Sequence, residues 1–394
     1  MAARTDLFQH PDYFALDELL TEEHKLIRDA VREYVKKEIS PIIEEYAQRA
    51  EFPQHIVKQL GELGCFGPTV PQEYGGGGLD YISYGLMMQE LERGDSGVRS
   101  TASVQGSLVM FPIQAYGSEE QKRKYVPKLA TAEFIGAWGL TEPSTGSDAG
   151  NMRTTAVRDG AGWVINGSKN FITHGISGDV VVLMTRTGKL GEKNNATAFI
   201  IDKGTPGFTS GKKEDKLGMR ASETAELIFQ DCKIPDSCRL GEVGGGFKQA
   251  LAILDGGRIS IASLGLGIAK GAYEAALKYS KERQQFGKSI SDFQAIAFKL
   301  ADMATKIDAA EMLIYRAAYL KNNHLPVSKE SAMAKLYSSE IAVEVATDGV
   351  QIHGGYGYIK DFPAEKFYRD AKLCTIGEGT SEIQKVVISR EILK

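Results

Sequence analysis

The spacing of the apolar residues changes twice along this 394-residue chain, and the change limits the folds that it can adopt. From about residue 20 to 135 apolar residues recur at helical spacing, as in LTEEHKLIRDAVREYVKKEISP, which ends in a helix-breaking proline. Between about 136 and 240 the segments, such as DVVVLMTRTG and TAELIFQDCKIP, are short, rich in β-branched and aromatic residues, and divided by Asp-Gly and Asn-Gly turn dipeptides. Helical spacing then returns and persists to Lys394.

These changes predict an α+β protein with three domains. We place an N-terminal helical domain in residues 1–135, a central β domain in residues 136–241 and a C-terminal helical domain in residues 242–394. Strands that follow one another through tight turns pair as hairpins. The β domain is therefore expected to be antiparallel and to lack βαβ units.

Charge and composition exclude several classes of partner. The net charge is -4, from 47 basic and 51 acidic residues, and no long basic run occurs, so nucleic acid is not expected as a partner. No uninterrupted apolar run approaches the length that crosses a bilayer, which predicts no membrane insertion. The four cysteines are scattered and none of the six histidines forms a His-x-x-x-His pair, so no metal site is expected.

The first residues bear on the compartment. The stretch MAARTDLFQHPDYF is polar and contains neither the apolar segment of a secretory signal nor an Arg- and Ser-rich, acidic-poor leader. We therefore expect a cytoplasmic protein of a bacterium or, as the alternative, a mature protein of the mitochondrial matrix.

Small polar residues gather in loops at the seams between the predicted domains. The loop AWGLTEPSTGSDAG, residues 137–150, offers hydroxyls and backbone N–H groups that suit a ligand with carbonyls or phosphates. In KNFIT, Phe171 and Thr173 are two positions apart, which on a strand places both on one face. A ring beside a hydroxyl could bind one flat ligand, although a buried strand would show the same pattern.

The C-terminal segment CTIGEGTSEIQ places a lone carboxylate, Glu378, between two glycines. Ser381 and Gln384 have capping-box spacing, so a helix is expected to begin there with Gly379 and Thr380 at its N-terminus. Backbone N–H groups and the helix dipole favour a phosphate at that end. The glycines would let a ligand approach the backbone closely, and the carboxylate would lie beside that ligand.

Together the segments LTEPSTGSDAG, KNFIT, ERQQFG, QIHGGYGY and EGTSEIQ resemble the motifs of the acyl-CoA dehydrogenase family in order and spacing. The resemblance runs from about Leu19 to Leu393. It implies an N-terminal helical domain, a central β domain and a C-terminal four-helix bundle, in a homotetramer where each subunit binds one FAD with help from a neighbour. It also implies an acyl-CoA substrate and an electron-transfer flavoprotein as the electron acceptor.

The resemblance further implies roles for individual residues. The flavin ring region would be contacted by Trp138, Leu140 and Thr141 on one side and by Phe171, Ile172 and Thr173 on the other. The rest of FAD would be held by residues of which several come from a neighbouring subunit, namely Arg283, Phe286, Gln351, Gly354, Gly355, Thr380 and Glu382. The acyl-CoA would be contacted by Ser147, Asp255, Arg258 and Gly379.

Glu378 matches the catalytic base of the family, which removes the α-proton of the thioester while the β-hydrogen leaves as hydride to the flavin, giving a trans-2-enoyl-CoA. A minority of the family carries the base immediately before the arginine of the LDGGRISIA segment, but here that position is Gly257. In the family the thioester carbonyl is stabilised by the backbone N–H of the base and by a ribityl hydroxyl of FAD. Burial beneath the thioester is expected to raise the pKa of Glu378.

Two substrate classes stay open. The segment ELERGDSGVRSTASVQGSLVM resembles glutaryl-CoA dehydrogenases, which implies that Arg99 binds a distal carboxylate, with Glu92, Ser100 and Ser103 nearby. Alternatively, Arg99 is exposed or pairs with Glu92 or Asp95. KLGMRASETAELIF and EGTSEIQ instead resemble short-chain enzymes acting on butyryl-CoA, and residue 377 is Gly where the glutaryl subfamily carries Tyr. Short-chain acyl-CoA is therefore the expected substrate and glutaryl-CoA the alternative, while the missing Tyr argues against decarboxylation.

Other classes of protein share parts of this pattern. An acyl-CoA oxidase would pass electrons to O2 and is distinguished by the release of peroxide. A non-catalytic flavin or acyl-CoA binding protein would not need the carboxylate of Glu378. A nicotinamide-dependent enzyme is the poorest fit, because the glycines of GLGIAKGAYEAALKYS lie in a helical segment that no strand precedes.

Overall fold

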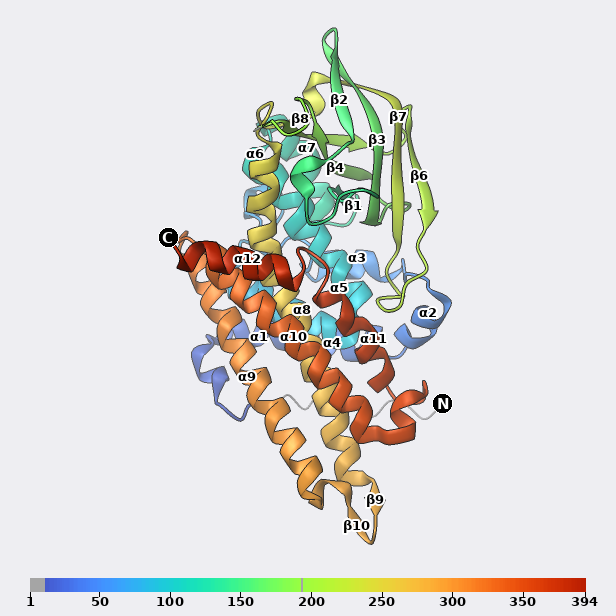
Figure 1. Ribbon diagram of the computed structural model, residues 1–394, viewed down its shortest axis with the longest axis vertical. Coiled ribbons are helices and arrows are strands. Elements are labelled where there is room, and N and C mark those ends of the chain that lie inside the picture. The colour runs from blue at the N-terminus through green and yellow to red at the C-terminus, as the bar shows by residue number, and fades with distance from the viewer. Residues whose placement is uncertain (1–10, 193) are drawn as a thin grey trace.

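The computed structural model describes residues 11–192 and 194–394. Its elements fall into three consecutive groups, helices first, then a sheet, then helices again (Figure 1). This order confirms the predicted α+β class. The change from helix to strand falls between Ala130 and Gly136, and the change back falls between Leu240 and Gly246. Residues 1–10, on which the expectation about a leader rests in part, lie outside the described residues.

In the described residues seven α-helices form the N-terminal group. They are α1 (Glu22–Tyr34), α2 (Ile43–Arg49), α3 (Ile56–Glu62), α4 (Tyr81–Gly94), α5 (Ser96–Ser103), α6 (Phe111–Tyr116) and α7 (Glu119–Ala130). A π-helical segment, Val35–Ile39, continues α1, and the predicted apolar stripe faces the core along both, because Val31, Val35 and Ile39 are buried. Thr21 caps α1, where its hydroxyl accepts a hydrogen bond from the backbone N–H of His24.

The sheet of the central group has the strand order β6-β7-β3-β2-β4-β5-β8, with β1 beside β4. Its strands are β1 (Gly136–Gly139), β2 (Thr155–Asp159), β3 (Gly162–Thr173), β4 (Val180–Arg186), β5 (Ala196–Asp202), β6 (Phe208–Lys213), β7 (Thr224–Pro235) and β8 (Arg239–Leu240). Most neighbours pair antiparallel as predicted, but β1 runs parallel to β4, and β2 meets β4 in parallel at one residue pair. Two strands and a long loop separate β1 from β4, so no tight turn forces that pair to be antiparallel.

One dipeptide that predicted a turn lies inside a strand. Asn166 and Gly167 belong to β3, where the register with β7 shifts between Ile165 and Gly167. Gly167 has a φ of 140°, and a Cβ at this position would come within 2.6 Å of Thr154. Glycine is therefore required by a β-bulge and a close backbone approach rather than by a hairpin.

The C-terminal group is built on three long helices, α8 (Gly246–Glu282), α9 (Gln294–Asn322) and α10 (Ser328–His353). A short hairpin of β9 (Gln284–Gln285) and β10 (Lys288–Ser289) joins α8 to α9. The fourth place of the predicted four-helix bundle is shared by two shorter helices, α11 (Ala364–Cys374) and α12 (Ser381–Ile392), which both pack on α10.

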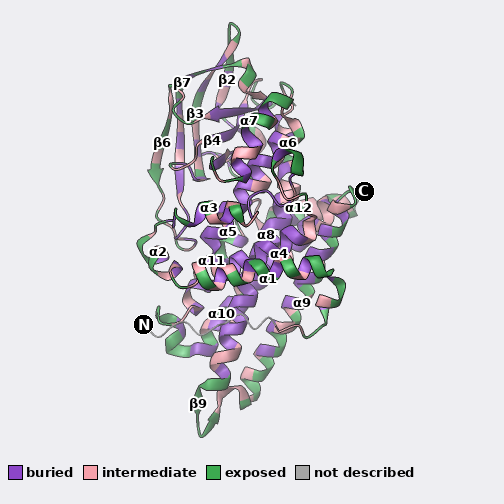
Figure 2. Cartoon of the chain, turned by 180° about the vertical axis from the view of Figure 1, so that it is seen from behind, coloured by how far each residue is buried: buried purple, intermediate pink, exposed green. Residues whose placement is uncertain are grey.

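Helix α8 connects the three groups. It leaves the sheet, passes through the centre of the molecule and contacts both α4 and α10 (Figure 1). Its length and its mean hydropathy of 1.4 in the most apolar window are those of a helix that could cross a membrane, but 72% of that window is buried inside the protein. Figure 2 shows α8 as mostly buried, so its apolar composition is explained by packing in the core.

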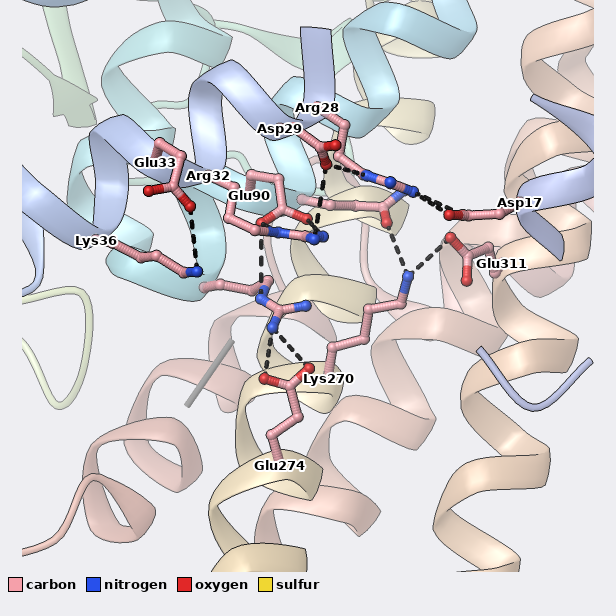
Figure 3. Close-up of polar contacts among 12 residues, drawn as sticks. Asp17, Arg28, Asp29, Arg32, Glu33, Lys36, Glu90, Lys270, Glu274 and Glu311 are labelled. Atoms are coloured by element: carbon pink, nitrogen blue, oxygen red, sulfur yellow. Dashed lines mark hydrogen bonds and ion pairs between the residues drawn. The ribbon is translucent and has the colours of Figure 1, made fainter. Parts of the chain in front are cut away.

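A network of buried ion pairs joins the N-terminal helices to α8 and α9 (Figure 3). Arg93 on α4 donates to both carboxylate oxygens of Glu274 on α8. Lys270, also on α8, pairs with Glu311 on α9 at 2.7 Å. A buried charge without its partner is costly, so the pair of Arg93 holds α4 against α8, and the pair of Lys270 holds α8 against α9. Helix α4 leads directly into α5, which carries Arg99.

Candidate active site

The loop that carries Glu378 lies between α11 and α12 and has an unusual backbone. Glu378 and Gly379 are both left-handed, with φ of 52° and 93°. This conformation is ordinary for glycine but uncommon for a residue with a side chain. The Gly379 carbonyl accepts hydrogen bonds from Lys335 Nζ on α10, at 2.7 Å, and from Gln384 Nε2 on α12, at 2.9 Å. Two buried side chains thus hold the loop from either side.

The cap of α12 differs from the prediction by one residue. Thr380 is the N-cap, and its Oγ1 accepts a hydrogen bond from Ile383 N at 3.3 Å. Ser381 is already helical, so the predicted capping box of Ser381 and Gln384 is wrong. The predicted position of Gly379 and Thr380 at a helix N-terminus is correct. No hydrogen bond from the backbone N–H of Glu378 or Gly379 occurs in the part of the chain that the structure describes.

The carboxylate of Glu378 is turned into the protein. Its Oε2 is screened from solvent and has no hydrogen-bond partner among the described residues. The oxygen lies over the backbone of α8, where a Cβ built on Gly257 would come within 2.0 Å of it. Burial raises the pKa of Glu378, while the cations Arg99, Lys335 and Arg258 oppose that rise. A carboxylate with no partner of its own is available to a ligand.

A buried polar cluster around Ser260 of α8 forms one side of this region. Arg99 on α5, only 1% exposed, donates to both the carbonyl and the hydroxyl of Ser260. The Ser260 hydroxyl also contacts Tyr84 Oη and Ser103 Oγ, each at 2.8 Å. In the described chain no carboxylate forms an ion pair with Arg99, and its Nε has no partner. A guanidinium buried without an anion indicates a site for an anionic group.

The alternative partners proposed for Arg99 are engaged elsewhere. Asp95 caps α5 through Gly97 N at 2.7 Å and pairs with Lys366 of α11 at 2.7 Å. Glu92 is buried and accepts a hydrogen bond from the Ser96 hydroxyl. Burial raises the pKa of Glu92 well above its ordinary value, although Arg99 opposes the rise.

The residues expected at coenzyme A are in part brought together. Asp255 and Arg258 lie one turn apart on α8 and form an ion pair, and the Ser328 hydroxyl donates to Asp255 at 2.6 Å. Arg258 is buried and its Nε has no partner among the described residues. Ser147 lies exposed in the loop that follows β1, and Ser100 is half-buried on α5 beside Arg99.

The residues expected at the flavin ring, which we call the flavin wall, come from β1, from the segment that follows it and from the end of β3. Trp138 is the third residue of β1, and its indole N–H is screened from solvent without a partner in the described residues. Thr141 and Thr173 are half-buried, while Leu140 is buried at the edge of the core. Phe171 is 63% exposed, as expected for a ring that faces a ligand.

A β-bulge produces this arrangement in β3. The register with β7 shifts between Lys169 and Ile172, and Phe171 has a left-handed φ of 59°. Ile172 is buried as a result, so only its backbone could meet a ligand. Lys169 is also buried and donates to the Leu140 carbonyl at 3.0 Å and to Glu142 at 2.7 Å. That ion pair fixes the end of β1 behind the flavin wall.

A second group of expected cofactor residues lies at the other end of the molecule, near β9 and β10 (Figure 1). Arg283, Gly354 and Gly355 line a cavity of about 450 Å³ together with Tyr279 and His353. Phe286 is 94% exposed at the tip of the hairpin, and Gln351 is exposed on α10. Thr380 and the exposed Glu382 belong instead to the start of α12. Within one chain, therefore, the residues of the flavin wall and the residues around Arg283 lie apart.

The residues present fit FAD. The flavin wall offers an indole donor without a partner, an exposed aromatic ring and two hydroxyls, which suit a flat ring system with polar edges. The cavity at Arg283 offers a guanidinium and glycines, which suit a pyrophosphate. One FAD could bind with its flavin ring at the flavin wall of one subunit and with its pyrophosphate at the Arg283 cavity of another.

Three family models match the chain in order. Residues 21–133 match the acyl-CoA dehydrogenase N-terminal domain, residues 137–232 the middle domain and residues 244–393 the C-terminal domain. The chain belongs to the acyl-CoA dehydrogenase family. It is an FAD-dependent oxidoreductase that dehydrogenates acyl-CoA.

Named relatives of this acyl-CoA dehydrogenase cover almost its whole length. The short-chain specific acyl-CoA dehydrogenase of Clostridium acetobutylicum is 46% identical over 381 residues, 96% of this chain and 100% of the relative. A subunit of the caffeyl-CoA reductase–Etf complex of Acetobacterium woodii is 45% identical over 376 residues, 95% of this chain and 99% of the relative.

Solved structures agree with the fold. Butyryl-CoA dehydrogenase from Megasphaera elsdenii superposes with a TM-score of 0.93 at 42% identity, covering 95% of this chain and 99% of the other. Glutaryl-CoA dehydrogenase from Mycobacterium smegmatis in complex with FADH2 superposes with a TM-score of 0.92 at 34% identity, covering 96% of each chain. The fold is thus shared by both substrate classes that the sequence left open.

Sequence reasoning missed several residues that shape the acyl-CoA dehydrogenase site. Ser260 and Tyr84 lie in helical stretches whose motifs do not mark them out. Lys335 could have been found, because in SAMAKLYSSEIA it occupies the helical face that also carries Ala332, Ser338 and Ser339. A lysine on an otherwise small and buried face needs a partner.

Proposed function

We propose that Glu378 is the base that removes the α-proton of a short-chain acyl-CoA bound between the loop before α12 and the flavin wall. The observation that carries this assignment is the carboxylate itself, whose Oε2 is buried, has no partner among the described residues and lies over a glycine of α8. A carboxylate that held the fold together would be expected to have a partner. The relatives named as short-chain and butyryl-CoA enzymes support the short chain length.

The electrostatics around Glu378 suit proton abstraction. Burial favours the protonated form of the carboxyl and raises its pKa, and the cations Arg99, Lys335 and Arg258 favour its ionised form. The opposing effects bring the pKa of a carboxyl toward the range where a general base works best. Arg258, which Asp255 holds on α8, therefore contributes to the charge around the base as well as to the coenzyme A site.

The thioester carbonyl gains negative charge as the α-proton leaves. The backbone N–H groups of Glu378 and Gly379 have no hydrogen-bond partner in the described chain, so they are free to donate to that oxygen. Bound FAD supplies the acceptor for the β-hydride. Trp138, Phe171 and Thr173 would orient the ring, and the product would be a trans-2-enoyl-CoA.

The two separate groups of cofactor residues support an oligomer. The flavin wall lies at β1 and β3, while Arg283, Gln351 and Gly354 lie near the hairpin at the other end of the bundle. A site completed by a neighbouring subunit would use both, as a homotetramer allows. Dissociation would then release FAD, and a monomer that retains a full complement of flavin would contradict this proposal.

An electron-transfer flavoprotein is the proposed electron acceptor. One relative is a subunit of a caffeyl-CoA reductase–Etf complex, which supports this class of partner. The bacterial relatives support a cytoplasmic location. Peroxide release during turnover in air, at the rate of substrate oxidation, would instead indicate an acyl-CoA oxidase.

A second candidate substrate is an acyl-CoA with a distal carboxylate, such as glutaryl-CoA. Arg99 favours it, because in the described residues this buried guanidinium is hydrogen-bonded only to Ser260 and forms no ion pair. Tyr84, Ser103 and Ser260 make the same region polar, which suits a carboxylate better than a terminal methyl group.

Anaerobic titration of the yellow protein with butyryl-CoA and with glutaryl-CoA tests both candidates. Loss of the oxidised flavin band with butyryl-CoA supports the short-chain proposal. Preferential bleaching by glutaryl-CoA supports the second candidate, and Arg99→Met should then lower kcat/KM for glutaryl-CoA by about 10²-fold, since an uncompensated buried carboxylate costs roughly 3 kcal/mol. No bleaching with either substrate would contradict both.

A further inference from the structure

Lys335 lies behind the loop that carries Glu378, the base loop, and its hydrogen bond to that loop has no role in the mechanism described so far. It is 0% exposed on α10, and among the described residues its side chain makes one hydrogen bond, from Nζ to the Gly379 carbonyl at 2.7 Å. No carboxylate forms an ion pair with it in the part of the chain that the structure describes. An ammonium taken out of water without an anion is unfavourable for the fold. Its burial at this carbonyl therefore calls for a functional explanation.

The carbonyl that Lys335 contacts belongs to the residue after Glu378. Glu378 and Gly379 are both left-handed, an arrangement that a side chain at 378 opposes and that surrounding contacts must maintain. Gln384 donates to the same carbonyl from α12, and Thr380 caps that helix. Lys335 is the contact that reaches the loop from α10, so it fixes the loop against the bundle and hence against Gly257.

The charge of Lys335 also acts on Glu378. Four titratable or charged groups face Lys335, namely Cys374 at the end of α11, Glu378 in the loop, Arg258 on α8 and Glu382 on α12. Glu378 in turn is faced by Arg99, Lys335 and Arg258. Asp255 partly neutralises Arg258 through an ion pair, and Lys335 has no such partner among the described residues. Its cation is therefore directed mainly at the base loop.

We propose that Lys335 is a positioning residue for Glu378: through the Gly379 carbonyl it holds the carboxylate over Gly257, and its charge favours the ionised form of that carboxylate. The proposal rests on the assignment of Glu378 as the base. Burial lowers the pKa of Lys335 to about 8, so the lysine carries its charge at neutral pH and loses it at alkaline pH.

Two variants separate the hydrogen bond from the charge. Lys335→Gln can keep a donor to Gly379 and loses the charge, whereas Lys335→Met loses both. Lys270→Met is the matched control, because Lys270 is also a buried lysine of the helical domain but pairs with Glu311 away from the base. The rate of flavin reduction by butyryl-CoA is measured anaerobically from pH 5.5 to 9.5 on protein with its normal FAD content.

In both Lys335 variants the acid limb of the profile should move up by about one pH unit or more, which lowers the rate about 10-fold at pH values on that limb. Lys335→Met should in addition lower the plateau rate that is reached at high pH. Lys335→Gln should lower that rate less, because it can keep a donor to the Gly379 carbonyl. Lys270→Met should keep the acid limb where the wild type has it. If Lys335→Met does not fold, Lys335→Gln decides the question. An unmoved acid limb in the folded Lys335 variants would overturn the proposal.

Glu378→Gln, measured in the same series, separates this inference from the function on which it depends. If Glu378→Gln reduces flavin at the wild-type rate, the assignment of the base is wrong, and the role of Lys335 as its positioning residue is overturned with it. If Glu378→Gln is inactive and the Lys335 variants follow the wild-type profile, only the inference about Lys335 fails.

Discussion

The contact between Gly257 and Glu378 makes a sharp prediction. A Cβ at position 257 would lie 2.0 Å from Glu378 Oε2 and 3.0 Å from its Cδ, whereas real Cβ contacts are essentially never shorter than 3.0 Å. In Gly257→Ala the carboxylate oxygen must therefore retreat by about 1 Å. Because it is the end of a flexible side chain, the fold can absorb the movement, but the position of the base cannot stay the same.

The structure gives the size of each effect. A misplacement of about 1 Å in a reacting group can cost on the order of 10²-fold in rate. Replacing glycine by alanine inside α8 should stabilise the helix by about 0.5–1 kcal/mol. Gly257→Ala is therefore expected to be at least as heat-stable as the wild type, while reducing its flavin about 100-fold more slowly with butyryl-CoA.

Gly256→Ala is the matched control. Position 256 lies in the same helix, and a Cβ there would have no neighbour within 4 Å. It should gain similar helix stability and reduce flavin at the wild-type rate. Rapid-mixing measurements of flavin reduction, with thermal unfolding of the same samples, compare the two variants. Equal rates for Gly257→Ala and Gly256→Ala would refute the placement of the carboxylate over α8.

Two further predictions concern the stability of the fold around the active site. Burial lowers the pKa of His174 to about 4, so between about pH 6.5 and 4 the folded protein binds fewer protons than the unfolded chain, and its stability falls as the pH drops. In His174→Gln the melting temperature should fall less steeply over that range. Glu274→Gln leaves Arg93 buried beside a neutral partner and should cost about 3–5 kcal/mol, seen as a lower melting temperature. As the control, Arg49→Gln breaks only an exposed ion pair and should change the free energy of unfolding by less than about 1 kcal/mol. An equal loss of stability in Glu274→Gln and Arg49→Gln would contradict the importance of the buried network.

The sequence predicted best those helices and strands in which the buried residues recur at a regular spacing. Val31, Val35 and Ile39 predicted the first helix because they recur on one face. Strand β6 was missed because FTSGKK is polar and partly exposed, so no apolar alternation marks it. Asn166-Gly167 was misinterpreted as a turn because a glycine in a bulge has the same local signature as one in a hairpin.

For the active site, the sequence indicated which residues belong to it better than it predicted their contacts and backbone conformation. The motifs singled out Glu378, Phe171 and Arg99, but the left-handed backbone at Phe171 comes from a bulge that only pairing with β7 reveals. The isolation of Arg99 could not be predicted, because it depends on Asp95 being engaged by Lys366 of α11, far away in the sequence. The cap at Thr380 instead of Ser381 is a shift of one residue, which is common at helix ends.

The rate of flavin reduction in Glu378→Gln tests the central claim most directly. Wild-type protein and variant, each with bound FAD, are mixed anaerobically with butyryl-CoA and with butyryl-CoA deuterated at the α-carbon. The wild type should reduce its flavin more slowly with the deuterated substrate, and the variant should be slower by about 10²–10⁴-fold or more, the usual contribution of a general base. Reduction of the variant at the wild-type rate, with the same isotope effect, would contradict the account.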